Sequence, residues 1–436
     1  MDKIENNKCC ACSACYSICP TNAISMNIDE KGFKRPVIDK NKCINCGLCE
    51  KTCAFNNKIL IKLNNQQVYA IKVKDEKKRK QSQSGGAFSI IAEKFLKKSS
   101  LVYGVTLKED FNAEYIGIDS VKDLHKLKGS KYVQAQINDV YKDVLKNLQQ
   151  NKIVFFSGTP CHIDGLLKYL KINNVSVDNL YTCDIVCHGT PSPQIFKNYI
   201  KFQEKEYKSQ IQKFNFRDKL FGWHSHIETI KLKKRISIVS SENYVNIFYS
   251  HLCLRNECYN CPYASTNRVS DITIGDYWGI EKIHPNFDDN KGISLVILNN
   301  EKGKKIYDDQ ISIAEMQSGL YYTIPVKKKL KVGEQYYWTI CATEDLPYDW
   351  RLMYSADKTG MASENTFVTS EGQQTFGEEQ QTVSQYCYYT HKDKVIIIAT
   401  CWCGSILIYL IILEIIQKRF RKPSADNEEK EKNHDL

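Results

Sequence analysis

Residues Cys9 to Pro20 read CCACSACYSICP and place five cysteines within twelve positions. A second stretch, CINCGLCEKTC from Cys43 to Cys53, repeats the same spacing. Each contains three cysteines separated by two residues, and a fourth cysteine after three more. In a tight loop this spacing lets three thiolates converge on one [4Fe–4S] cube, while the fourth reaches the other cube from the following helix. The two stretches therefore predict two [4Fe–4S] clusters.

Each cluster is expected to take three ligands from one stretch and one from the other. The two sets are Cys9, Cys12 and Cys15 with Cys53, and Cys43, Cys46 and Cys49 with Cys19. Structural zinc also binds paired cysteines, but a three-plus-one pattern that occurs twice is unusual for zinc. Cys10 lies outside the pattern and is interpreted as a packed thiol.

The composition favours metal sites over disulfides. The chain has 436 residues and nineteen cysteines, and its first residues, MDKIENNKCC, lack the apolar stretch of a secretory signal. We therefore expect a reducing cytosol, where dense thiols usually bind metal. The net charge of +11 comes from scattered lysines, which indicates a solvated surface and predicts no nucleic-acid partner.

An uncharged stretch near the C-terminus predicts a membrane helix. Val395 to Leu413 spans nineteen residues without a charge, enough at 1.5 Å per residue to cross a bilayer core. We expect a transmembrane helix over 395–416 that acts as a single-pass C-terminal anchor, with the redox domain facing the cytosol. The polar residues 331–394 are predicted to be a stalk or linker, and 417–436 a disordered tail.

Between these ends, strand-like and helix-like segments alternate from about Val68 to residue 330. QVYAIKV, LVYGVTL and IVFFS are predicted strands, and GGAFSIIAEKFLKK and DVYKDVLKNLQQ are predicted helices. Within the cysteine-dense start, IDEKGF (Ile28 to Phe33) is a predicted turn between two strands. The sequence has no GxGxxG motif, so a Rossmann NAD domain has no support.

The middle of the chain carries a sparser set of four cysteines: Cys161, Cys187, Cys258 and Cys261. Four thiolates are enough for one more cluster or for one zinc ion. From spacing alone, unrelated buried cysteines are an equally good interpretation.

Six motifs occur in one order: SQSGGAF (82–88), KGSKYVQ (128–134), FSGTPCHIDGL (156–166), CHGTPSP (187–193), FRDKLFGW (216–223) and RVSDITIGDYWGI (268–280). Together they resemble the coenzyme F420 hydrogenase/dehydrogenase beta-subunit family over about residues 1–300, with a two-cluster bacterial-type ferredoxin domain at the N-terminus. Ala54, in place of a proline after Cys53, and His162, in place of a glutamine, depart from the family pattern. The resemblance implies FAD and a further [4Fe–4S] cluster, the latter on the four middle cysteines. It leaves Cys183 and Cys253 as packing residues.

The fold class expected on this basis is α+β. A ferredoxin-like (βαβ)₂ module precedes a mixed α/β flavin-binding region and the transmembrane helix. The expected domains are 1–58 (ferredoxin), 66–145 (family N-terminal α/β domain), 146–330 (family C-terminal flavin and iron–sulfur domain), 331–394 (stalk), 395–416 (transmembrane helix) and 417–436 (tail).

The resemblance also suggests residues that contact the flavin: Ser84, Gly85, Gly86, Ser130, Lys131, Tyr132, Gly158 and Thr159. Gly85 and Gly86 precede a predicted helix and could present N–H groups to the FAD pyrophosphate. Equally, SGG could only cap that helix, and residues 130–132 could be surface residues. Arg217 and Asp218 could pair with each other, and His162 could bond a cluster sulfur or be an ordinary loop residue.

Two functions remain in view. The first is an iron–sulfur flavoprotein oxidoreductase that passes electrons between an FAD-linked two-electron carrier and [4Fe–4S] clusters. Its partner would be a redox protein or a small-molecule hydride carrier, of the F420 type or another. The alternative is a membrane-tethered, ferredoxin-type electron-transfer protein with a non-catalytic domain that binds a partner. No residue of the sequence stands out as a catalytic acid or base.

Overall fold

The computed structural model describes residues 8–56, 66–233 and 238–310, together with three short strands at 321–325, 335–336 and 367–368. The predicted membrane helix and tail lie outside these residues. In the part that is described, no helix has both the length and the apolar composition needed to cross a bilayer. Membrane attachment therefore stays a prediction from the sequence.

The N-terminal module consists of two short helices and a β-hairpin. Its elements are α2 (Ala14–Ile18), β1 (Ile24–Ile28), β2 (Lys34–Ile38) and α3 (Leu48–Lys51). β1 and β2 are antiparallel, and the predicted turn between them is confirmed. Asp29 closes this turn, because its Oδ1 accepts bonds from the N–H groups of Lys31 (3.0 Å) and Phe33 (2.8 Å). Any further strands of a (βαβ)₂ module would fall in 1–7 and 57–65, outside the described residues.

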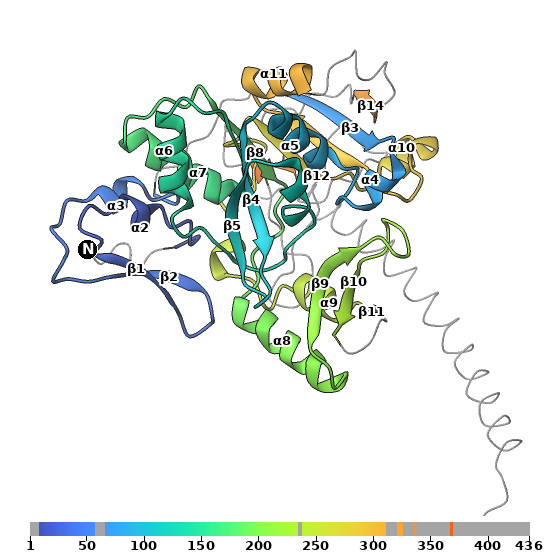
Figure 1. Cartoon of the computed structure of the whole chain (residues 1–436), viewed down its shortest axis with the longest axis horizontal. Coiled ribbons are helices and arrows are strands. Elements are labelled where there is room, and N and C mark those ends of the chain that lie inside the picture. The colour runs from blue at the N-terminus through green and yellow to red at the C-terminus, as the bar shows by residue number, and fades with distance from the viewer. Residues whose placement is uncertain are drawn as a thin grey trace, which may run out of the picture. The chain divides into compact units, whose positions relative to one another are not determined.

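A nine-stranded mixed sheet forms the centre of the molecule, as predicted for a mixed α/β region (Figure 1). Its strand order is β14-β3-β13-β12-β8-β7-β4-β5-β6. The strands are β3 (Gln67–Val73), β4 (Leu101–Leu107), β5 (Ala113–Ile118), β6 (Ala135–Gln136), β7 (Val154–Gly158), β8 (Leu180–Ile185), β12 (Ile272–Asp276), β13 (Ser294–Leu298) and β14 (Tyr321–Pro325). The four adjacent strands β12, β8, β7 and β4 are mutually parallel.

Both faces of this sheet are covered, which explains the continuous apolar run of β7. Alternate residues of a strand point to opposite faces, and Val154 and Phe156 pack with α6 (Val140–Gln149) and α7 (Pro160–Ile172). Phe155 points the other way into a cluster with α5 (Ala87–Lys97). The five elements predicted by letter in the middle region are therefore confirmed.

The sheet draws its strands from both predicted family domains. β3 to β6 come from 66–145, and β7, β8, β12, β13 and β14 come from 146–330. β13 pairs with β3 across more than 220 residues of sequence. The boundary expected at residue 145 therefore runs through one sheet and does not separate two compact bodies.

A smaller three-stranded sheet, ordered β11-β10-β9, packs with α8 and α9. Its elements are α8 (Pro193–Glu206), β9 (Ile211–Asp218), β10 (Ile227–Leu232), β11 (Ile238–Ser241) and α9 (Asn243–Tyr249). The other described elements are α4 (Glu76–Lys80), η1 (Val121–Lys126), η2 (Asn256–Cys258), α10 (Ile280–Ile283), η3 (Pro285–Phe287), α11 (Glu301–Gln310), β15 (Gln335–Tyr336) and β16 (Phe367–Val368). β15 and β16, which pair with each other, fall within the predicted stalk.

The N-terminal module packs on the helices that cover one face of the large sheet. Helix α2 contacts both α6 and α7 (Figure 1). Gly165 on α7 makes close approach necessary, since a Cβ there would lie 2.8 Å from the Cys12 sulfur. Lys168 of the same helix donates from Nζ to the carbonyls of Cys53 (2.8 Å) and Ala54 (3.1 Å). Helix α7 thus joins the large sheet to the first predicted cluster.

Candidate functional site

A cavity of about 610 Å³ lies at the carboxyl ends of the four parallel strands. Val105 of β4, Gly158 of β7, Ile185 of β8 and Asp276 of β12 all line it. Ligand sites of α/β sheets usually lie at this edge, because the loops that follow parallel strands gather there. The volume falls within the range of about 300–1,000 Å³ that is typical of small-molecule sites.

Aromatic side chains form much of the cavity wall. Tyr132 stacks on Phe248 with ring centroids 4.4 Å apart. Trp278 stacks on Trp223 at 4.4 Å, and the Arg217 guanidinium lies 4.7 Å from the centre of the Trp278 ring. Stacked aromatic faces with few polar groups suit a planar heterocycle.

Arg217 and Asp276 form a buried ion pair at this wall. Trp223 also donates to Asp276, with 3.0 Å between Nε1 and Oδ1. Burial alone would raise the pKa of the Asp276 carboxyl, but the Arg217 charge and these hydrogen bonds lower it below its usual value. The expected pairing of Arg217 with Asp218 is wrong, because Asp218 instead accepts a bond from Thr229 Oγ1 at 2.7 Å.

Of the predicted SGG loop, Ser84 lines the cavity but Gly85 and Gly86 serve packing. The Gly85 N–H donates to Ser294 Oγ (2.9 Å), and the Gly86 N–H donates to the Gln83 carbonyl (3.1 Å). A Cβ on Gly85 would lie 2.0 Å from the Ile71 carbonyl oxygen. The idea that these two N–H groups are presented to a pyrophosphate is therefore wrong, and the helix-entry alternative is confirmed.

The other five predicted flavin contacts all line the cavity: Ser130, Lys131, Tyr132, Gly158 and Thr159. Lys131 Nζ donates to the carbonyls of Leu127 (3.1 Å) and Lys128 (2.8 Å). Although the side chain as a whole is only partly buried, its ammonium group is enclosed, and this burial lowers the pKa of Lys131 to about 7. Residues 130–132 are consequently part of a site and not simply surface residues.

The four middle cysteines converge beside the cavity. Cys161 begins α7, Cys187 follows β8, and Cys258 ends η2, three residues before Cys261. Burial, and then repulsion from the other three thiols, raises the pKa of Cys187. All four line one small pocket, and residues 187–190 line both this pocket and the large cavity. Convergence removes the alternative of unrelated buried cysteines.

Four thiolates fit a [4Fe–4S] cube, in which each sulfur binds a different iron. In 8–56, 66–233 and 238–310, no three or more His, Cys, Asp or Glu side chains are grouped tightly enough to hold a single metal ion. The sulfurs of a cube are spaced more widely than the ligands of one ion, so the donor set agrees with a cluster.

The first N-terminal ligand set is also brought together. Cys9 and Cys12 each interact electrostatically with Cys53, and Cys15 interacts with Cys9 and Cys53. In the second set, Cys19, Cys43 and Cys49 pack around Ile24 and Ile38. Cys46 interacts with Cys49 and is exposed, so the second set lies nearer to solvent.

Cys10 occupies the space between the first N-terminal set and the middle set. Its side chain is 3% exposed and hydrogen-bonds with both Cys12 and Cys161. It is a packed thiol, as interpreted from the sequence, and it also marks where the two ligand sets meet.

The two histidines that follow middle cysteines bond to other rings. His162 Nδ1 lies 3.0 Å from the Tyr115 hydroxyl, and burial lowers the pKa of His162 to about 3. His188 Nε2 lies 2.8 Å from His251 Nε2. His162 therefore has a hydroxyl partner and, on the described contacts, is a satisfied buried histidine.

Sequence reasoning missed several residues of the site. Asp276 and Trp278 lie in a quoted motif, GDYWG, but were given no role there. Arg255 and Glu257 sit on either side of a cysteine-rich turn, where only the cysteines stood out. A charged residue inside an otherwise apolar, cysteine-bearing segment is the signal that could have drawn attention to them.

Comparison with known proteins agrees with this geometry. A model of the N-terminal region of the coenzyme F420 hydrogenase/dehydrogenase beta subunit matches residues 68–142, and its C-terminal counterpart matches 151–318. The chain belongs to this family. A 4Fe–4S dicluster domain model matches residues 8–57, which confirms iron–sulfur clusters in the N-terminal module. This member of the family is therefore an iron–sulfur oxidoreductase.

Two relatives of this family member come from methanogens: one of the subunits of the F(420)H(2) dehydrogenase of Methanosarcina mazei, and the beta subunit of the F420-dependent formate dehydrogenase of Methanocaldococcus jannaschii. The first is 23% identical over 333 residues, 72% of this chain and 86% of the relative. The second is 24% identical over 266 residues, 59% of this chain and 61% of the relative. A solved chain of the F420-reducing [NiFe] hydrogenase complex from Methanosarcina barkeri aligns with a TM-score of 0.42 at 13% identity, covering 62% of this chain and 85% of that one.

Proposed function

We propose that the chain is a flavin-dependent electron-transfer subunit, with FAD in the large cavity and a third [4Fe–4S] cluster on Cys161, Cys187, Cys258 and Cys261. One observation carries this proposal: Cys187 to Thr190 lines both the cavity and the four-cysteine pocket. A ligand in the cavity would therefore lie against the backbone that carries a cluster ligand. When bound, FAD accepts a hydride and releases its electrons singly.

The chain's own residues would divide this work among them. Tyr132, Phe248 and Trp278 provide flat faces that orient a ring system and exclude water. Cys187 connects the cavity to the middle ligand set, and the Cys161–Cys10 contact connects that set to the first N-terminal one. The exposed Cys46 would be the exit or entry point for a redox protein partner.

The names of both relatives contain F420, and both describe subunits of dehydrogenases. This supports a small-molecule hydride carrier of the F420 type as the cavity's second reactant, together with a redox protein partner. The predicted helix at 395–416 would hold this assembly at a membrane, with the redox domain on the cytosolic side.

The decisive experiment is to purify the full chain anaerobically in detergent and to quantify its iron, sulfide and flavin. We expect about twelve irons, three cubes of four, and one FAD per chain. About eight irons without flavin would instead support the alternative, a ferredoxin-type protein whose larger domain only binds a partner.

Flavin binding should weaken as pH rises through about 7. Burial lowers the pKa of Lys131 to about 7, so this ammonium at the cavity wall loses its proton above that pH. Because a pyrophosphate anion favours the charged lysine, we expect up to about tenfold weaker FAD affinity per pH unit above 7. Fluorescence titration of the flavin-stripped chain at pH 6.5 and 8.5 measures this. Lys131→Arg stays charged and should flatten the dependence; an equally steep profile in that variant would contradict the role of Lys131.

A further inference from the structure

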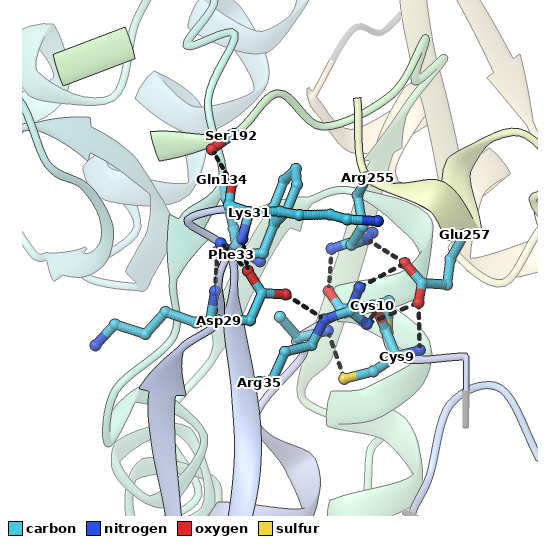
Figure 2. A network of polar contacts seen from close by, with 12 residues as sticks. Cys9, Cys10, Asp29, Lys31, Phe33, Arg35, Gln134, Ser192, Arg255 and Glu257 are labelled. Carbon is cyan, nitrogen blue, oxygen red and sulfur yellow. Dashed lines mark hydrogen bonds and ion pairs between the residues drawn. The ribbon is translucent and has the colours of Figure 1, made fainter. Parts of the chain in front are cut away.

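Arg255 lies between the middle cysteine set and the first N-terminal set (Figure 2). It is only 2% exposed. Its Nη1 donates to the carbonyl of Cys10 at 2.6 Å, and its Nη2 donates to the Cys258 sulfur at 3.7 Å. One guanidinium therefore touches a ligand of the middle set and the loop that carries the first set.

The backbone holds this side chain in place from two directions. The Arg255 N–H donates to the Thr190 carbonyl at 2.9 Å, at the end of the segment shared by the cavity and the middle pocket. The Arg255 carbonyl in turn accepts the Cys258 N–H at 2.9 Å. The position of the guanidinium is therefore set by the same turn that positions the sulfur.

The nearest carboxylate, on Glu257, is largely engaged elsewhere. Its Oε2 lies 3.7 Å from Arg255 Nε, but Arg35 binds both of its oxygens, at 2.7 and 3.0 Å (Figure 2). The Cys9 N–H also donates to Glu257, at 3.3 Å. Arg35 has a second partner in Asp29, at 3.2 Å, so the acidic groups are directed mainly at Arg35. The Arg255 charge is left facing the Cys258 sulfur.

We infer that Arg255 raises the reduction potential of the middle cluster, while Glu257 lowers it. This inference rests on the third cluster of the proposed function. A reduced cluster carries one more negative charge than the oxidised cluster, so a nearby cation and an N–H···S bond both stabilise reduction. A buried carboxylate at the same place has the opposite effect. Neither residue donates electrons; both position charge beside a ligand.

The test is a redox titration of the full chain, followed by EPR, in three variants. Arg255→Gln should shift the midpoint of the middle cluster downward by about tenfold in the one-electron equilibrium constant, 59 mV. Glu257→Gln should shift it upward, and Arg255→Lys, which keeps the charge, should remain closer to the wild type. The N-terminal clusters should move less in every variant.

Opposite signs distinguish this role from a structural one. If loosened packing were the cause, Arg255→Gln and Glu257→Gln would shift the potential in the same direction, and that result would overturn the inference. Unchanged potentials would do the same. If Arg255→Gln fails to assemble the cluster, Glu257→Gln decides alone, since only a rise agrees with the inference. A wild-type chain with about eight irons would instead refute the third cluster itself.

Discussion

A full-length chain carrying Cys258→Ala is expected to bind about eight irons instead of about twelve, because a cube of four irons needs its four thiolates. Cys258 is buried, and its thiol lies near Cys187 and Cys261. The N-terminal sets use other cysteines and should keep their two clusters. Iron analysis and EPR measure the loss. A hydride donor should still reduce the flavin of this variant, but the N-terminal clusters should stay oxidised.

Cys253→Ala is the matched control for this experiment. Cys253 is in the same segment and is also buried, at 3% exposed, but its sulfur contacts the Ile247 carbonyl at 3.5 Å and not the other thiols of the middle set. It should retain all of its iron. Unchanged iron in Cys258→Ala, or an equal loss in both variants, would contradict the assignment of the middle cluster.

Replacing Asp276 by asparagine should destabilise the protein by roughly 3–5 kcal/mol, because it strands the buried Arg217 charge. Arg217 is 4% exposed, and Asp276 is the carboxylate with which it forms its ion pair. The same change should weaken flavin binding, since Arg217 and Trp278 lie together at the cavity wall. Denaturant unfolding of the anaerobically purified chain, with and without added FAD, measures both effects.

Asp39→Asn provides the comparison for the stability measurement. Asp39 pairs with Lys42 at 3.4 Å, but their side chains are 40% and 64% exposed, and such pairs contribute at most about 1 kcal/mol. An Asp276→Asn variant that lost no more stability than Asp39→Asn would show that the buried pair is not structurally important. Changing Arg217 to methionine together with Asp276→Asn should recover part of the loss, because no charge is then stranded.

Local features were predicted well because they depend on neighbouring residues. The strands QVYAIKV and LVYGVTL match β3 and β4, and Asp29 closes the hairpin turn at the predicted position. SGG was the exception among these local features. Its N–H groups satisfy Ser294 Oγ and the Gln83 carbonyl, and a Ser294 partner more than 200 residues away cannot be inferred from a glycine pair.

The sequence by itself determined the N-terminal iron–sulfur chemistry, since three ligands of each cluster lie within seven residues and their convergence is a property of one loop. Only the tertiary structure decided the rest of the site. Cys161 and Cys261 are one hundred residues apart, and they meet because parallel pairing of β7 and β8 places the loops that follow them at one edge. The same edge forms the cavity, and the turn at Arg255 reaches across to Cys10. Such contacts depend on which strands are neighbours, and no spacing along the chain records that choice.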